Sequence, residues 1–336
     1  MIHYDQITEV HLEISSLCNA RCPLCPRNFH GYPHNDGYVE ANMSLASAKT
    51  IFNTQLLTQL KQIYINGNYG DAVMNPETSD IVEYFKATNP SLDVVISTNG
   101  SARDREFWMR LGQAKAHIEF CLDGLEDTHH LYRQNTNWQT IINNAKIFMQ
   151  AGGVATWKMI KFDHNQHQLA DCKQLSDSLG FSTFVVVDQG RNVGPVFDKQ
   201  GNFTHQIGNY QGTKNFKFLL LRKQTSDVLL EDVQSGVEHK PVIKCYSQRQ
   251  HSIYISSTGD VSPCCWLGFS PQTAGKGSYQ QAVNAQIAPL VKHNNALAHP
   301  IEKCIAWFKA VEEAWTKQSF EKGRLISCND NCGFDK

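Results

Sequence analysis

Apolar and polar residues alternate in short segments through the first part of the chain. Between these segments lie stretches in which apolar residues recur at helical spacing. Such alternation predicts half-buried strands, while apolar residues three or four positions apart predict amphipathic helices. The clearest helix includes Trp138, Ile141 and Ile142 and ends before Gly152. The predicted strands are residues 10–14, 63–65, 92–98, 117–122, 154–160 and 184–187, and the predicted helices are residues 44–60, 76–88, 104–111, 138–149 and 166–179.

Six strands separated by five helices form a run of βαβ units. Such units favour a parallel sheet with right-handed crossovers. A complete eight-stranded barrel usually needs about 250 residues, and this pattern ends near residue 190. The expected fold class is therefore α/β, with a partial (β/α)6 TIM-like barrel.

The pattern changes after residue 190. Residues 191–240 are rich in Gly, Asn, Gln and Lys and have weak periodicity, which predicts loops. Alternation returns at 252–256, and a turn at 258–260 before Val261 predicts a hairpin, with helices expected at 278–292 and 302–319. The predicted domains are a barrel over residues 1–190, a linker over 191–240 and a C-terminal extension over 241–336.

Composition and charge exclude several classes of protein. The 336 residues are 41% hydrophobic and 19% charged, which is typical of a globular chain with a core. With 31 Lys and Arg against 32 Asp and Glu, the net charge is −1, which argues against a nucleic-acid partner held by phosphate neutralisation. No segment approaches the roughly 20 apolar residues of a membrane span, and the N-terminus lacks a secretion signal. We therefore expect a cytoplasmic protein without a membrane partner.

Eleven cysteines are the unusual feature of the composition. An odd number without an export signal fits a disulfide scaffold poorly, so metal binding or catalytic sulfur is the better interpretation. Cys18, Cys22 and Cys25 form a C-x3-C-x2-C loop directly after the first predicted strand. Three thiolates around an iron–sulfur cube leave one iron open to another ligand.

Four motifs at the ends of consecutive predicted strands resemble the radical S-adenosylmethionine (SAM) superfamily. The cysteine loop follows the first strand, residues 67–71 (GNYGD) follow the second, 97–100 (STNG) end the third and 121–124 (CLDG) end the fourth. The carboxyl ends of parallel strands form the mouth of a barrel, where active sites of such folds lie. The resemblance covers about 190 residues and implies an enzyme of that superfamily.

The resemblance also implies a role for each motif. The three N-terminal cysteines would hold a [4Fe-4S] cluster whose fourth iron binds the amino and carboxylate groups of SAM. The backbone of the glycine-rich loop would meet the methionine ammonium group, while Asn99 would contact the ribose or carboxylate and Arg133 would pair with the carboxylate. The SAM-binding residues implied in this way are Gly67, Asn68, Gly70, Asp71, Asn99 and Arg133.

Two positions depart from the family pattern. Leu24 stands where an aromatic residue is frequent, which weakens a contact with adenine, and Cys121 stands where a serine is frequent. An alternative for the N-terminal cysteines is a zinc knuckle that His30 and His34 complete. Cys172 shares an apolar helix face with leucines, so we expect it in the core.

A second cysteine group lies in the C-terminal part. Cys245, Gly259 and Cys264 form a C-x13-G-x4-C arrangement, which resembles the opening of the SPASM or twitch extension of radical SAM enzymes. Cys328 and Cys332 supply two more thiolates, and because only this last pair of the longer SPASM run is present, a twitch-type extension fits better. The implied ligands of one auxiliary [4Fe-4S] cluster are Cys245, Cys264, Cys328 and Cys332, with Cys265 or Cys304 as replacements and a zinc ribbon as the alternative.

The resemblance implies reductive cleavage of SAM to a 5′-deoxyadenosyl radical that abstracts a hydrogen atom, with electrons from a donor such as flavodoxin or ferredoxin. An auxiliary cluster would accept an electron from the substrate, which would make the net reaction an oxidation, or would bind the substrate directly. Resemblance to barrels with such extensions implies a peptide or protein as the substrate. The alternatives are dehydrogenation or rearrangement of a sugar, aminocyclitol or nucleoside and, from another class, a non-catalytic zinc-binding module. Candidates for contact with the substrate are Asp188, Arg191 and Trp266.

Overall fold

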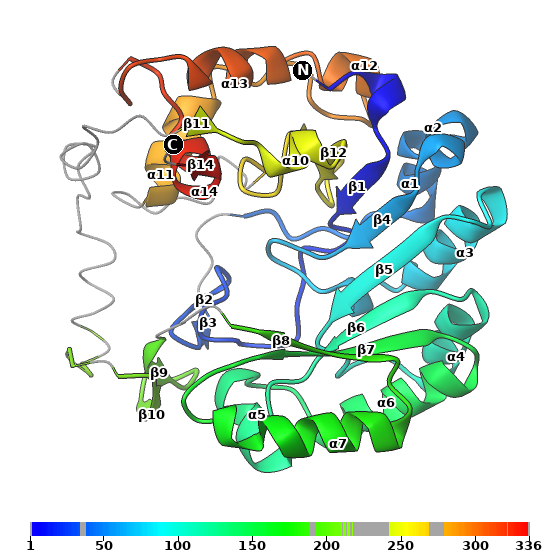
Figure 1. The fold of residues 1–336 in the computed structure, drawn as a ribbon, viewed down its shortest axis with the longest axis vertical. Helices are drawn as coiled ribbons and strands as arrows, with labels where there is room; N and C mark the ends of the chain where they lie inside the picture. Colours follow the sequence, from blue (N-terminus) through cyan, green and yellow to red (C-terminus); the bar gives the residue numbers. More distant parts are fainter. Residues whose placement is uncertain are drawn as a thin grey trace.

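The structure is a computed structural model, and its main sheet combines strands from both ends of the chain (Figure 1). It describes residues 2–33, 38–188, 193–209, 211, 212, 214, 215, 217, 242–268, 279–320 and 322–334. The sheet order is β13-β12-β1-β4-β5-β6-β7-β8, in which all neighbours are parallel except β13 and β12. The strands are β1 (Glu9–Leu12), β4 (Gln62–Ile65), β5 (Asp93–Thr98), β6 (His117–Cys121), β7 (Val154–Ile160), β8 (Thr183–Val187), β12 (Ser252–Ile255) and β13 (Val261–Ser262).

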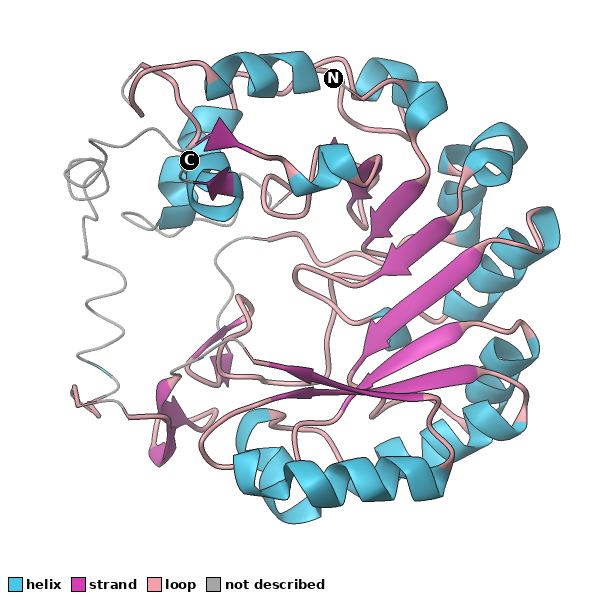
Figure 2. Cartoon of the chain, viewed as in Figure 1, coloured by secondary structure: helices cyan, strands magenta, loops and turns pink. Residues whose placement is uncertain are grey.

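Helices between the strands cover one face of this sheet (Figure 2). They are α1 (Leu45–Ile51), α2 (Thr54–Gln59), α3 (Thr78–Thr88), α4 (Arg105–Gln113), α5 (Glu126–Tyr132), α6 (Trp138–Gln150) and α7 (Leu169–Leu179). Short 3-10 helices are η1 (Tyr4–Gln6), η2 (Ala72–Met74) and η3 (Gln166–Gln168).

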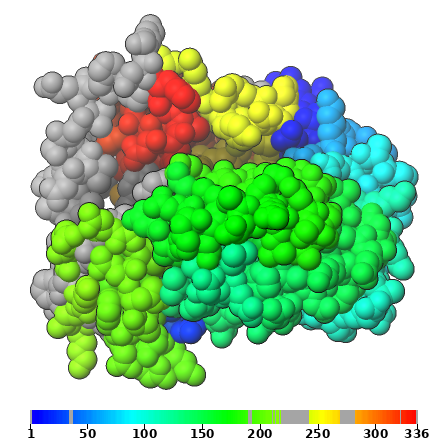
Figure 3. All heavy atoms as spheres, turned by 60° about the horizontal axis from the view of Figure 1, so that its bottom comes forward, coloured from blue at the N-terminus to red at the C-terminus, as the bar shows by residue number. Residues whose placement is uncertain are grey.

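The C-terminal residues add short helices and a small two-stranded sheet. The helices are α10 (Tyr246–Arg249), α11 (Tyr279–Ile287), α12 (Ile301–Cys304), α13 (Phe308–Trp315) and α14 (Ile326–Cys332). The paired strands outside the main sheet are β2 (Asn28–Phe29) with β3 (Tyr32–Pro33), β9 (Gly194–Phe197) with β10 (Phe203–Ile207), and β11 (Val242–Ile243) with β14 (Gly333–Phe334). Lys244 donates its backbone N–H to the carbonyl of Cys332 at 2.8 Å, and the last residues (red) lie beside the segment around α10 (yellow) in Figure 3. Within the described residues, none of the helices combines the length and apolar character that a bilayer span requires.

The two faces of the main sheet differ in polarity. Val10 and Ile63 are fully buried in the core beneath the helices. On the opposite face, Tyr64, Glu119 and Lys158 contact one another from β4, β6 and β7. A parallel sheet that is covered on both faces carries apolar residues on both faces. The strands of this sheet instead alternate apolar and polar residues, because helices cover one face and the other face is polar.

All six strands predicted in the first 190 residues are confirmed. The single helix predicted over 44–60 is wrong, because α1 ends after Ile51 and a second helix, α2, begins at Thr54. Asn53 causes the break, since its side chain accepts the N–H of Leu56 and caps α2. The prediction also missed α5 between the fourth strand and its helix.

The helix predicted over 76–88, with Asn75 as its cap, begins two residues later than expected. The side-chain amide of Asn75 is buried and donates to the carbonyls of Ile14 (2.9 Å) and Met43 (2.7 Å), so it joins two loops. The helix α3 begins at Thr78 instead. The side-chain oxygen of Asn75 still accepts the N–H of Glu77 at 2.9 Å, so the same side chain caps the turn before the helix and joins the two loops.

The C-terminal residues share the main sheet with the N-terminal strands. The hairpin predicted near Gly259 is confirmed as β12 and β13, with Gly259 at φ +86°. Its first strand pairs in parallel with β1, from Glu9 opposite Ser252 to Leu12 opposite Ile255. The predicted loop region contains the β9–β10 hairpin, and the helix predicted over 302–319 divides into α12 and α13. The domain boundaries at residues 190 and 240 stay predictions.

Candidate functional site

A cavity of about 310 Å³ lies at the carboxyl ends of the parallel strands. Its walls come from the cysteine loop after β1, from the loops after β4 and β5, and from residues at the ends of β5, β6 and β7. It brings together all the residues predicted for the N-terminal cluster and for SAM: Cys18, Cys22, Cys25, Gly67, Asn68, Gly70, Asp71, Asn99 and Arg133.

The three cysteine thiols of the loop are enclosed beside positive and polar groups. The guanidinium of Arg133 lies 3.7 Å from the sulfur of Cys22, and the amide of Asn99 lies 3.8 Å from the sulfur of Cys18. Burial raises the pKa of all three thiols, that of Cys25 to about 12. Metal ligation requires the thiolate form, so this set of enclosed thiols fits a site that a cationic metal centre completes.

The glycine-rich loop is held close to the backbone of the cysteine loop. A Cβ atom on Gly70 would lie 1.8 Å from the carbonyl oxygen of Ser15, and one on Gly67 would lie 2.5 Å from the carbonyl oxygen of Gly70. Both positions therefore require glycine. The carboxylate of Glu13 accepts the backbone N–H groups of Tyr69 (2.8 Å) and Gly70 (2.9 Å).

Asp71 joins the ends of β4 and β5. Its carboxylate accepts hydrogen bonds from the hydroxyl of Thr98 (2.6 Å) and from both the backbone and the side-chain N–H of Asn99 (2.7 Å each). Burial raises the pKa of Asp71, and these donors oppose that effect. The carboxylate thus orients Asn99 toward the cavity.

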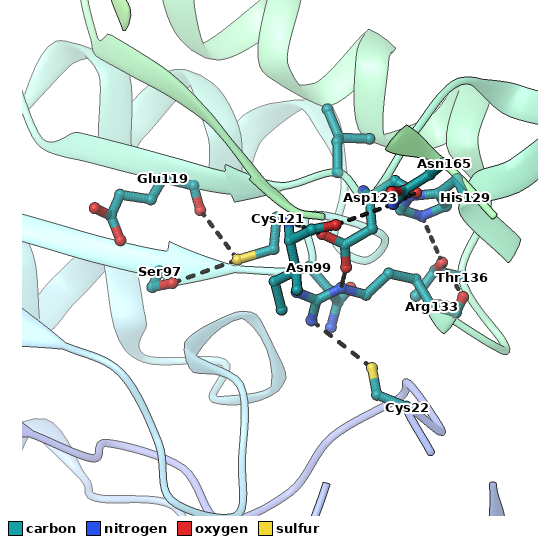
Figure 4. Close-up of polar contacts among 12 residues, drawn as sticks. Cys22, Ser97, Asn99, Glu119, Cys121, Asp123, His129, Arg133, Thr136 and Asn165 are labelled. Atoms are coloured by element: carbon teal, nitrogen blue, oxygen red, sulfur yellow. Dashed lines mark hydrogen bonds and ion pairs between the residues drawn. The ribbon is translucent and has the colours of Figure 1, made fainter. Parts of the chain in front are cut away.

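A buried ion pair fixes Arg133 (Figure 4). Its Nε lies 2.6 Å from the carboxylate of Asp123, which is fully buried and also accepts the N–H of Ile160 at 2.6 Å. His129 accepts the N–H of Asp123 at 3.2 Å and contacts the hydroxyl of Thr136. Burial lowers the pKa of His129 to about 3, so the imidazole is neutral at pH 7. Asp123 pairs with Nε of Arg133, and Nη1 at the other end of this guanidinium points toward the sulfur of Cys22.

The polar face of the sheet continues the cavity with groups that the sequence did not reveal. The carboxylate of Glu119 accepts hydrogen bonds from Tyr64 (3.0 Å) and Lys158 (2.9 Å), and Lys158 lines the cavity. Burial alone would lower the pKa of Lys158, but Tyr64 and Glu119 raise it above its ordinary value. Cys121 contacts the hydroxyl of Ser97 at 3.4 Å (Figure 4).

Sequence reasoning missed Glu13, Tyr64, Glu119 and Lys158. The signal for them was a charged or hydroxyl-bearing residue at the polar positions of strands that are otherwise apolar. Their pairing depends on register between strands, which the sequence alone does not define.

The four C-terminal cysteines predicted as ligands meet at one place. Cys245, Cys264, Cys328 and Cys332 line a small cavity of about 30 Å³ against the core. A hydrogen bond with Cys245 lowers the pKa of Cys332 to about 6. Of the two replacement candidates, Cys304 is buried and donates to the carbonyl of His299 at 3.5 Å. Cys265 lines an adjacent cavity of about 470 Å³, which Cys245, Cys264 and Cys332 also border.

The residues predicted to contact the substrate lie in different places. Trp266 is about half exposed and lines both cavities that the C-terminal cysteines border. Asp188 is exposed and pairs with Lys161, while Arg191 lies outside the described residues. Cys172 is in the core, as predicted.

The zinc alternative for the N-terminal loop involved His30 and His34. The ring of His30 packs edge-on against Phe29 and Phe197, and His34 lies outside the described residues. In the part of the chain that the structure describes, no three His, Cys, Asp or Glu side chains are arranged to hold a single metal ion.

The fold of the chain is shared with solved structures that contain SAM. Streptococcus suis SuiB bound to S-adenosylmethionine is similar over 95% of this chain and 76% of its own, with 12% identity and a TM-score of 0.51. Native anSMEcpe with bound AdoMet is similar over 97% of this chain and 91% of its own, with 14% identity and a TM-score of 0.53. The same protein with AdoMet and the Cp18Cys peptide is similar over 97% and 90%, with 14% identity and a TM-score of 0.50.

At these identities the likeness shows the fold, and it confirms the expected α/β class with a large parallel sheet. No protein-family model and no curated protein matches the sequence.

Proposed function

We propose that the chain is a radical SAM enzyme that oxidatively modifies a peptide or protein. The observation that carries this proposal is the 310 Å³ cavity, in which the three cysteines of one loop meet the glycine-rich loop, Asn99 and Arg133. A further cysteine of the cavity wall, Cys121, comes from β6 and contacts the hydroxyl of Ser97. Three thiolates suit an iron–sulfur cube with one open iron. The fold likeness to proteins with bound SAM supports the same conclusion.

The residues of the cavity fit the implied cofactors. The enclosed thiols of Cys18, Cys22 and Cys25 would hold a [4Fe-4S] cluster, and the close approach at Gly67 and Gly70 provides a backbone cradle for SAM. When both are bound, the pair supplies one-electron cleavage of SAM to a 5′-deoxyadenosyl radical. The protein supplies binding, orientation and exclusion of water.

Individual side chains would orient SAM. The guanidinium of Arg133, held by Asp123, can pair with the methionine carboxylate. Glu13 engages the N–H groups of Tyr69 and Gly70, so the loop offers carbonyl oxygens to an ammonium group. Asn99, which Asp71 orients, would contact the ribose or carboxylate.

The C-terminal cysteines would form the second site. Cys245, Cys264, Cys328 and Cys332 make a complete set of four for one auxiliary [4Fe-4S] cluster in a twitch-type extension. Such a cluster would accept an electron from the substrate, which makes the net reaction an oxidation, while flavodoxin or ferredoxin would serve as the electron donor. The peptide bound to anSMEcpe supports a peptide substrate.

Anaerobic purification and reconstitution test the proposal. We expect brown protein with about eight irons per chain, corresponding to two cubes, and 5′-deoxyadenosine after addition of SAM and dithionite. The same sample without dithionite is the control. Colourless protein with stoichiometric zinc and no 5′-deoxyadenosine would instead establish a zinc-binding module.

A further inference from the structure

The glycine-rich loop touches the C-terminal cysteine turn directly. The side-chain amide of Asn68 donates to the backbone carbonyl of Cys265 at 2.9 Å, across 197 positions of sequence. Cys265 is next to Cys264, which lines the small cavity of the C-terminal cysteines. A single hydrogen bond therefore connects the loop that lines the N-terminal site to the backbone of the C-terminal site.

A second contact connects the same two regions through a buried carboxylate. The hydroxyl of Tyr254, on β12, donates to one oxygen of Glu13 at 2.6 Å. The other oxygen of Glu13 accepts the N–H groups of Tyr69 and Gly70. Glu13 is only 2% exposed and Tyr254 only 1%, so neither group can replace its partner with bulk water.

The cysteine turn also packs on the ring of Tyr254. A Cβ atom on Gly268 would lie 2.2 Å from that ring, so the backbone of the turn lies against it. The N–H of Gly268 donates to the carbonyl of Cys264 at 2.9 Å, which closes the turn over residues 264–268. A shift of Cys264 is thus transmitted to Tyr254 as well as to Asn68.

We propose that the C-terminal cysteine turn positions the glycine-rich loop, so that filling the C-terminal cysteine site with its metal centre raises the affinity of the N-terminal site for SAM. Asn68, Glu13 and Tyr254 act as positioning residues in this coupling. The inference rests on the proposed function. Because coupling between sites is reciprocal, SAM should also strengthen metal retention at the C-terminal site.

A double-mutant cycle on SAM affinity tests the coupling. Cys328→Ser empties the C-terminal site, and Asn68→Ala removes one of the two connections. SAM dissociation constants are measured by equilibrium dialysis on anaerobic protein with equal loading of the N-terminal cluster. We expect each single variant to weaken SAM binding about 3- to 10-fold, the effect of losing one hydrogen bond, and the double variant to be no weaker than the poorer single variant.

The outcomes of the cycle separate this inference from the proposed function. Equal SAM affinity in Cys328→Ser and the unsubstituted protein, or effects that multiply in the double variant, would overturn the coupling. Absence of SAM binding by the unsubstituted, cluster-loaded protein would overturn the proposed function itself. Asn295→Ala is the matched control, since Asn295 donates to Thr258 (2.9 Å) and Asp260 (3.1 Å) on the same hairpin but not to the loop, and its SAM affinity should be unchanged.

A second measurement does not depend on emptying the metal site. Tyr254→Phe removes only the hydroxyl that reaches Glu13, and we expect faster hydrogen exchange of the Tyr69 and Gly70 amides together with SAM binding weakened about 3- to 10-fold. Tyr84→Phe is the control, because Tyr84 donates to the carbonyl of Phe52 at 2.8 Å, away from the loop. Unchanged exchange in Tyr254→Phe, or an equal change in both variants, would contradict the inference.

Discussion

The two cysteine sites are built in opposite ways. The N-terminal site takes three cysteines from one short loop and borders a cavity of about 310 Å³ whose other walls are polar strand ends. The C-terminal site gathers four cysteines from separate segments around a cavity of about 30 Å³ that packs against the core, and Cys245, Cys264 and Cys332 also border a cavity of about 470 Å³. Metal sites with a complete protein ligand set are closed, and those that do chemistry keep an open position.

This difference separates the tasks of the sites. Under the proposed function, the space and the polar groups at the N-terminal site would allow a second molecule to share the metal centre. The C-terminal site supplies a complete set of four cysteines, so under the proposed function it would hold the hairpin and exchange electrons, with a cavity of about 470 Å³ beside it. The predictions below test this division.

The largest expected effect comes from removing one ligand at each site. Cys22→Ala should abolish 5′-deoxyadenosine formation, because two thiolates cannot hold the cube open to SAM. Cys328→Ala should retain SAM cleavage at saturating SAM but lose oxidised product. Chromatographic quantification of 5′-deoxyadenosine checks both. Equal loss in the two variants would show that the sites do not divide the tasks in this way.

Breaking the buried ion pair should damage the N-terminal site next most severely. Arg133→Met leaves Asp123 as a buried charge without its cation, which costs about 3–5 kcal/mol of unfolding free energy and removes SAM binding. Urea unfolding and equilibrium dialysis measure these effects. Arg110→Met is the control, because its partners Asp80 and Glu83 are surface groups and such pairs contribute about 1 kcal/mol or less. Recovery of stability in the Asp123→Asn, Arg133→Met double variant is expected, and its absence would contradict the mechanism.

The neutral His129 beside this pair predicts a pH dependence. Its pKa falls from 6.5 to about 3 on folding because of burial, so protonation favours the unfolded state once the pH drops below 6.5. The stabilisation is complete above that pH and is lost progressively down to pH 3. Between pH 7 and 5 the loss should be about 2 kcal/mol. Urea unfolding at both pH values should show a smaller loss in His129→Gln, and an equal loss would exclude this cause.

Local patterns predicted the parts of the fold that depend on neighbouring residues. The six barrel strands follow from alternation, and the placement of Cys18, Gly67, Asn99 and Arg133 around one cavity follows from motifs at strand ends. The pairing of β1 with β12 joins residues that are far apart in sequence and has no local signal.

Polar side chains used in tertiary contacts were the main source of error. Asn75 has the pattern of a helix cap, but its side-chain amide also joins two loops. The break between α1 and α2 at Asn53 does not interrupt the helical spacing of the apolar residues, so the sequence pattern did not reveal it. Glu13 and Tyr254 meet only because β12 enters the sheet beside β1. The sequence left Cys304 as a candidate ligand, and only its burial in the structure argues against that role.

The smallest expected effect distinguishes two adjacent cysteines. Cys264 lines both the cavity of about 30 Å³ and the adjacent cavity of about 470 Å³, whereas Cys265 lines the larger cavity and not the smaller one. Only the backbone carbonyl of Cys265 contacts Asn68, so Cys265→Ser preserves that contact. We expect Cys265→Ser to retain about eight irons and Cys264→Ser to retain about four, as iron analysis will measure.

Serine keeps the size of the side chain in both variants, so a difference in iron content reflects ligation rather than packing. Loss of iron in Cys265→Ser with retention in Cys264→Ser would exchange the two ligands and shift the cluster toward the cavity of about 470 Å³, which Cys245 and Cys332 also border. The iron contents of the two variants therefore decide which of two neighbouring sulfur atoms completes the C-terminal site.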